Sequence, residues 1–134
     1  MPRQMIEYNT FEELLGTTIV AIENKNDEEL VIMLDDGREA HLWHEQDCCE
    51  SVTIEDIAGN LDDLLNSPIL LAEEMSSNDD LDGVNIEHQD DSFTWTFYKL
   101  ATNRGAVTIR WYGESNGYYS ESVAFRISKG ACDA

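Results

Sequence analysis

The chain has 134 residues, with 28 Asp and Glu against 8 Lys and Arg, which gives a net charge of −20. This length is typical of one domain, expected to span residues 1–134, and the acidity argues against direct nucleic-acid binding, because phosphate contacts need a basic surface. No apolar run approaches the roughly 20 residues that cross a bilayer, and the first residues lack the apolar stretch of a signal peptide. We therefore expect a cytoplasmic protein with no membrane partner.

The first part of the chain predicts a short helix followed by a three-stranded meander. Thr10 is a suitable N-cap, Glu13 completes a capping box, and Gly16 supplies a left-handed exit from the helix. Three runs rich in β-branched and apolar residues then predict strands at residues 17–23, 29–34 and 38–43. The Asp-Asp-Gly sequence at residues 35–37 indicates a hairpin between the last two strands.

The middle of the chain is less regular. Residues 44–50 are polar, and residues 54–65 mix apolar and acidic side chains in a pattern that fits two short helical pieces or a strand and a helix. A strand is expected at residues 69–75. The polar, turn-rich residues 76–91 are expected to form a long mobile loop.

The final third predicts a second meander, with strands at residues 93–102, 106–112 and 120–127. The expected fold class is therefore α+β, mainly antiparallel sheet in two meanders, with one to three short helices.

Asp47, Cys48, Cys49 and Glu50 form a compact cluster directly after His44, and each of these residue types is able to bind a metal. Adjacent cysteines do not easily reach one tetrahedral ion together, and no second cluster supplies further ligands. A cysteine beside a histidine also fits a nucleophile and its base, which requires a cleft partner. We favour packing of the two thiols under a loop, with no metal, no cofactor and no catalysis.

A second cluster surrounds one glycine-bounded loop near residue 115. It combines a guanidinium, an amide, a hydroxyl and aromatic rings, a set that suits phosphate and nucleobase recognition. The candidate ligand-binding residues are Phe97, Lys99, Arg104, Arg110, Tyr112, Ser115, Asn116, Tyr118 and Tyr119. The alternative is an aromatic-rich hairpin whose rings belong to the core.

The charges are unevenly distributed. Residues 93–130 contain five of the eight basic residues and only two acids, Glu114 and Glu121, so the rest of the chain carries −23. This asymmetry suggests two faces with different tasks, or an ordinary solvated acidic surface beside a sheet.

The Asp-Cys-Cys-Glu segment at residues 47–50 and the Ser-Asn-Gly-Tyr-Tyr segment at residues 115–119 resemble those of a family of small phage-encoded proteins. The pattern is similar to the Thoeris anti-defence sponges, which sequester cyclic ADP-ribose-type immune signals and, as a family implication, cyclic oligonucleotides. Tyr112-Gly113 stands where those sponges have an Arg-Asn pair, and Arg110 lies two residues upstream, on the same face of a regular strand.

Two functions follow as expectations. The first is a non-enzymatic phage counter-defence protein, in the cytoplasm of an infected bacterium, that captures a cyclic nucleotide-type small molecule in a pocket completed by a second copy in a homo-oligomer. The second is an acidic inhibitor or nucleic-acid mimic that covers a basic surface of a host defence protein. The position of Arg110 distinguishes them, because a sponge needs this cation in a pocket.

Overall fold

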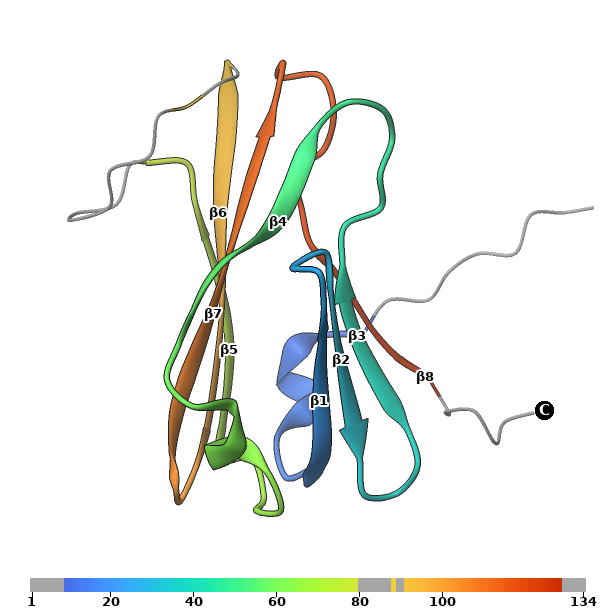
Figure 1. Ribbon diagram of the computed structural model, residues 1–134, viewed down its shortest axis with the longest axis vertical. Coiled ribbons are helices and arrows are strands. Elements are labelled where there is room, and N and C mark those ends of the chain that lie inside the picture. The colour runs from blue at the N-terminus through green and yellow to red at the C-terminus, as the bar shows by residue number, and fades with distance from the viewer. Residues whose placement is uncertain (1–8, 80–87, 89–90, 129–134) are drawn as a thin grey trace, which may run out of the picture.

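The computed structural model describes residues 9–79, 88 and 91–128 of the chain. Its main elements are two four-stranded antiparallel sheets, which Figure 1 shows as two facing layers. Sheet I has the strand order β1-β2-β3-β8, with β1 Ile19–Lys25, β2 Glu29–Leu34, β3 Glu39–Trp43 and β8 Ala124–Ser128. Sheet II has the order β4-β7-β6-β5, with β4 Ser51–Ala58, β5 Leu71–Ser77, β6 Ser92–Thr102 and β7 Gly105–Ser115. Two 3₁₀ turns, η1 Phe11–Leu14 and η2 Leu61–Leu64, complete the described elements.

The core lies between the two sheets. Side chains alternate between the two faces of a strand, so Leu30, Ile32 and Leu34 of β2 point inward together. Phe11 of η1 fills the space between the layers, with its ring centroid 4.7 Å from that of Tyr98 and 5.3 Å from that of Phe125. The short helix therefore serves as a wedge in the core.

The expected fold class is confirmed: the protein is built mainly from antiparallel sheet with only short helical turns. The capping box at the first helix is also present, since Thr10 N donates to Glu13 Oε2 at 2.7 Å. Gly16 and Gly37 both have positive φ angles, as the predicted helix exit and hairpin require. Of the two alternatives for residues 54–65, the strand followed by a helical turn is correct.

The prediction that residues 120–127 close a meander beside β7 is wrong. The last strand pairs with β3 in sheet I, where Phe125 lies opposite Leu42. The place beside β7 is occupied by β4, in which Ile54 pairs with Trp111. Because one edge of β7 pairs with β6 and the other with β4, the chain crosses to sheet I, where Phe125 enters the core.

The prediction of a mobile loop at residues 76–91 is wrong for its first two residues, because β5 continues to Ser77. Most of that segment, residues 80–87 and 89–90, lies outside the described residues.

Candidate functional site

Two loops meet at one end of the sandwich, which is uppermost in Figure 1 and is called the upper end below. Residues 44–50 connect β3 to β4, and residues 116–123 connect β7 to β8, so both cross from one sheet to the other. Because β3 pairs with β8 and β4 pairs with β7, the two crossings run side by side. This topology brings together the two segments on which the sequence hypotheses depend.

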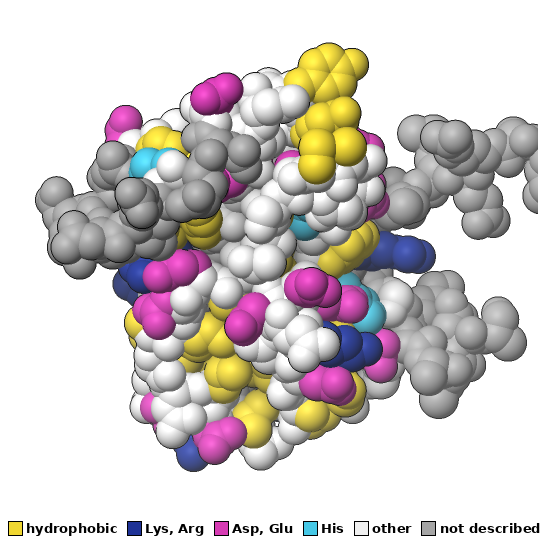
Figure 2. Space-filling model, turned by 45° about the horizontal axis from the view of Figure 1, so that its top comes forward, with side chains coloured by type: hydrophobic (Ala, Val, Ile, Leu, Met, Phe, Trp, Pro, Cys, Tyr) yellow, Lys and Arg dark blue, Asp and Glu magenta, His cyan; other side chains and the backbone are white. Residues whose placement is uncertain are grey.

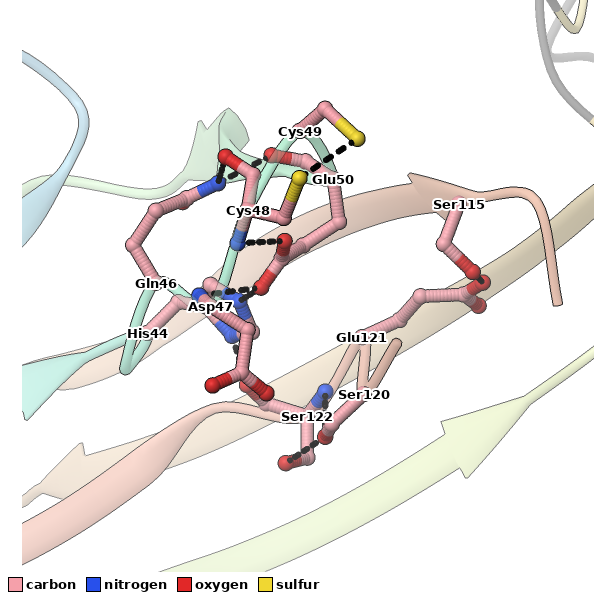
Figure 3. Close-up of polar contacts among 10 residues, drawn as sticks. All are labelled: His44, Gln46, Asp47, Cys48, Cys49, Glu50, Ser115, Ser120, Glu121 and Ser122. Atoms are coloured by element: carbon pink, nitrogen blue, oxygen red, sulfur yellow. Dashed lines mark hydrogen bonds and ion pairs between the residues drawn. The ribbon is translucent and has the colours of Figure 1, made fainter. Parts of the chain in front are cut away.

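The first loop is organised around the carboxylate of Glu50 (Figure 3). The side chain of Glu50 is fully buried, and its Oε2 accepts hydrogen bonds from His44 Nε2 at 2.7 Å and Asp47 N at 2.9 Å. Its Oε1 accepts from Cys48 N at 2.9 Å. Burial alone would raise the pKa of Glu50, but His44 and the two backbone amides lower it to about 2. Glu50 is therefore a buried anion that holds the loop.

His44 joins the first loop to the second. Its Nδ1 donates to Ser122 O at 2.7 Å, and its Nε2 faces the Glu50 carboxylate. With only 4 % of its side chain exposed, His44 is a buried structural link between the two loops.

A second carboxylate, that of Glu121, fastens the other loop to sheet II. Thr94 Oγ1 donates to Glu121 Oε1 at 2.7 Å, and Ser115 Oγ donates to Oε2. Ser115 Oγ in turn accepts from Gly117 N at 3.0 Å. A Cβ atom at Gly113 would lie 3.0 Å from Glu121 Cβ, so the absence of a side chain at Gly113 permits this close approach.

The expectation that the two thiols pack beneath a loop is wrong. Cys48 and Cys49 are both exposed, and their sulfur atoms lie 3.0 Å apart. The space beneath the loop is filled by the Glu50 side chain instead. The Cys48 side chain raises the pKa of Tyr119, and the hydrogen bond with Cys48 raises the pKa of Cys49. The two sequence motifs therefore lie near each other at the upper end.

Arg110 lies on the outer face of sheet II, away from this end. Its Nε donates to Glu55 Oε2 at 2.6 Å, its Nη2 is also 2.6 Å from that oxygen, and Asp56 Oδ2 is 3.8 Å away. The guanidinium carbon lies 5.4 Å from the centroid of the Trp95 ring, which is 4.5 Å from that of Tyr112. Arg110 is thus engaged by carboxylates and an aromatic ring of its own chain.

The structure divides the predicted ligand-binding residues among three places. Phe97, Lys99, Arg110 and Tyr112 are on the outer face of sheet II, as their cross-strand pairing requires. Ser115, Asn116, Tyr118 and Tyr119 lie at the upper end with residues 47–50. Arg104 is at the opposite end of the β6–β7 hairpin, where its Nη1 donates to Leu65 O at 3.3 Å. At about 3.3 Å per residue, β7 separates Arg104 from Ser115 by roughly 36 Å.

Two clefts flank the first loop, and His44 contributes to both. The Trp43 cleft, of about 610 Å³, is lined by residues that include Lys25, Glu28, Glu29, Trp43 and Ser51. The Ser122 cleft, of about 450 Å³, is lined by residues that include Asn9, Glu45, Asp47, Glu74, Ser120 and Ser122. Arg110 lines neither cleft.

The Ser122 cleft is acidic. Three carboxylates reach it from two segments, and none of the described residues that line it is Lys or Arg. Burial and the charge of Glu12 raise the pKa of Glu74, as expected where negative charges gather. Figure 2 shows acidic side chains spread over the upper end and the flank in view, with basic side chains in only a few places.

The sequence predictions missed Glu45, Glu74 and Ser122 as neighbours. Glu74 and Ser122 lie far apart in the chain, and only the crossing of the last strand to sheet I brings them together. The polar composition of residues 44–50 was the one local signal for this region.

Among the residues that the structure describes, no group of three or more His, Cys, Asp or Glu side chains is placed to hold a metal ion. Within residues 9–79, 88 and 91–128, no helix has the length and apolar character needed to cross a bilayer.

Comparison with known proteins gives a family without a described activity. The family model for a domain of unknown function, DUF7448, matches residues 12–125, so the chain belongs to this family. No curated protein matches the chain, and no solved structure matches it either.

Proposed function

We propose that this DUF7448 protein is a non-enzymatic binding protein whose acidic upper end receives a basic surface of another protein. The observation that carries the proposal is the Ser122 cleft, where Glu45, Asp47 and Glu74 converge and the described lining holds no Lys or Arg. A net charge of −20 adds a long-range field that attracts a positive partner. In the phage setting that the sequence resemblance implies, the partner is a basic surface of a host defence protein.

The position of Arg110 supports this function over nucleotide capture. A phosphate ligand needs a cation that is free to contact it, whereas Arg110 is held by Glu55 and Asp56 on an open sheet face. Arg104 and Lys99 are exposed at separate places, one at the β6–β7 turn and one in the middle of β6. The basic residues of this part of the chain thus do not converge on one site.

The contacts and the burial of His44 support the part of the proposal that the protein binds its partner without catalysing a reaction. Both ring nitrogens are engaged, by Ser122 O and by the Glu50 carboxylate, and the ring is almost fully buried. This histidine is therefore not placed to accept a proton from Cys48 as a general base.

The test compares two triple variants with the same change of charge. Glu45→Gln, Asp47→Asn and Glu74→Gln neutralise the cleft, and Glu23→Gln, Asp35→Asn and Asp62→Asn neutralise exposed acids elsewhere. Binding of an octa-arginine peptide is measured by calorimetry at low and at physiological ionic strength. Exposed ion pairs contribute about 0.2–1 kcal/mol each, so the three changes together cost about 0.6–3 kcal/mol and the cleft variant should bind roughly 3- to 150-fold more weakly than wild type.

The control variant should lose less than about threefold, because its charges act only through the screened field of the whole protein. Equal losses in the two variants would contradict a site and leave only nonspecific attraction. Wild-type protein that does not bind the peptide at low ionic strength would also contradict the proposal.

Nucleotide capture is the second candidate, and one observation favours it. The two segments that carry the resemblance lie near each other at the upper end, where Cys48 raises the pKa of Tyr119. Tyr118 beside them is 84 % exposed and packs edge-on against Tyr119, with ring centroids 5.0 Å apart. An exposed tyrosine is able to stack on a nucleobase, and a second protomer would enclose it.

A thermal-shift panel of cyclic ADP-ribose derivatives and cyclic oligonucleotides tests this candidate, with light scattering to follow assembly. A ligand at 100 times its dissociation constant stabilises the folded state by about 2.7 kcal/mol. Tyr118→Ala should abolish that shift, while Arg110→Ala should leave it intact. Absence of any shift across the panel would remove this candidate.

A further inference from the structure

The thiols of Cys48 and Cys49 form a feature that neither candidate function uses. Both side chains are exposed, and the two sulfur atoms lie 3.0 Å apart. A disulfide bond is about 2.05 Å long, so the sulfurs need to approach by only about 1 Å to bond. The backbone that presents them is fixed, because Cys48 N donates to Glu50 Oε1 and Gln46 Nε2 donates to Cys48 O.

We propose that Cys48 and Cys49 are a reversible redox modification site, which disulfides of the oxidised glutathione class convert into a disulfide between the two neighbouring residues. One protein thiolate attacks a sulfur of the small disulfide, which forms a mixed disulfide and releases one small thiolate. The second protein thiol loses its proton and attacks the protein sulfur of that mixed disulfide. This step forms the Cys48–Cys49 bond and expels the second small thiol, so two protein thiols are oxidised and one small disulfide is reduced.

The geometry of adjacent residues makes this bond easy to reverse. Neighbouring Cα atoms are about 3.8 Å apart across a trans peptide, whereas disulfides usually join Cα atoms about 4.4–6.8 Å apart. The resulting strain favours reduction, as for other labile and regulatory disulfides. The pair therefore stays reduced in a reducing cytoplasm and closes only when small disulfides are in excess.

Formation of the Cys48–Cys49 disulfide affects the contacts that hold residues 44–50 in place beside residues 116–123. Cys48 bonds through its amide to Glu50 at 2.9 Å and through its carbonyl to Gln46 at 3.2 Å, and its side chain raises the pKa of Tyr119. Movement of Cys48 toward Cys49 disturbs both hydrogen bonds and changes the surroundings of Tyr119. Oxidation is thus expected to loosen residues 44–50 from residues 115–123 and to destabilise the upper end.

The covalent step is tested by intact-mass spectrometry in a Cys132→Ser background, which removes the third thiol of the chain. Incubation with oxidised glutathione should give the loss of two hydrogens with no retained glutathione. Cys48→Ser and Cys49→Ser, each in the same background, should instead retain one glutathione, because no second thiol resolves the mixed disulfide. A stable glutathione adduct on the protein with both thiols, or no modification, would overturn the proposal.

The structural consequence is tested by thermal unfolding of the same proteins. The oxidised protein should melt roughly 3–6 °C below the reduced one, and dithiothreitol should restore the original melting temperature. Cys49→Ser should show no such shift. Complete oxidation with an unchanged melting temperature would contradict the coupling to the upper end. None of these measurements involves a bound partner, so they stand or fall separately from the proposed function.

Discussion

Replacing Ser115 by alanine removes two hydrogen bonds from the joint that holds residues 116–123 against sheet II. Ser115 Oγ donates to Glu121 and accepts from Gly117 N at 3.0 Å. Thr94 Oγ1 supplies the other donor to the same carboxylate, at 2.7 Å. Because Ser115 and Glu121 are both buried, water does not readily replace the lost donor.

The expected loss in the free energy of unfolding depends on whether each lost hydrogen bond joins Ser115 to a charged or to a neutral group. A hydrogen bond to a charged group contributes about 1.5–3 kcal/mol and a neutral one about 0.5–1.5 kcal/mol. Ser115→Ala should therefore lower the free energy of unfolding by about 2–4 kcal/mol, and Thr94→Val by about 1.5–3 kcal/mol. For a chain of this length the first change corresponds to a fall in Tm of roughly 6–15 °C.

The assay is urea denaturation of a double-mutant cycle, in which Ser115→Ala is made in wild type and in Glu121→Gln. If the carboxylate is the partner that matters, the cost of Ser115→Ala should fall by about 1–2 kcal/mol when Glu121 is neutral. Additive effects, within about 0.5 kcal/mol, would refute the view that Glu121 fastens this loop.

Three further predictions concern other parts of the chain. The pKa of Glu50 is lowered from 4.5 to about 2, so its contribution to stability should be complete above pH 4.5 and lost as the pH falls toward 2. In urea denaturation across this range, the free energy of unfolding should fall more steeply for wild type than for Glu50→Gln. Parallel curves for the two proteins would contradict this prediction. Arg110→Ala should lower the free energy of unfolding by no more than about 1 kcal/mol, because its carboxylate partners lie at the surface; calorimetric unfolding measures this, and a larger loss would show that the cluster around Trp95 depends on it. Gly113→Ala places a Cβ 3.0 Å from Glu121 Cβ and should lower the free energy of unfolding by about 1–3 kcal/mol. An unchanged Tm would contradict this prediction and show that residues 116–123 move to make room for the methyl group.

Local signals in the sequence predicted the parts of the fold that depend on neighbours in the chain. The capping box of Thr10 and Glu13 and the hairpin at Gly37 involve residues a few positions apart, and both are present. The alternating residues 93–102 formed the expected strand for the same reason. The fold class followed from these elements.

The pairing of distant strands was beyond such signals. Nothing local in residues 51–58 indicates that they take the place beside β7, and this pairing is what sends β8 to sheet I. Arg110 meets Glu55 only because the two strands are neighbours, although 55 positions separate the residues. The exposure of Cys48 likewise depends on Glu50, whose burial is stabilised by His44 and backbone amides rather than by hydrophobicity. The sequence did not predict the acidic Ser122 cleft, because its segments come together only when the chain crosses from β7 in sheet II to β8 in sheet I.

The pairing of β3 with β8 also has a consequence for synthesis of the chain. Leu42 pairs with Phe125, so one edge of β3 lacks this partner until residues 124–128 have left the ribosome. An unpaired strand edge is a template for pairing with other chains, and pairing across so long a separation is slow. Sheet I is therefore completed last, and the emerging chain is most exposed to misassembly at β3 in the interval before β8 arrives.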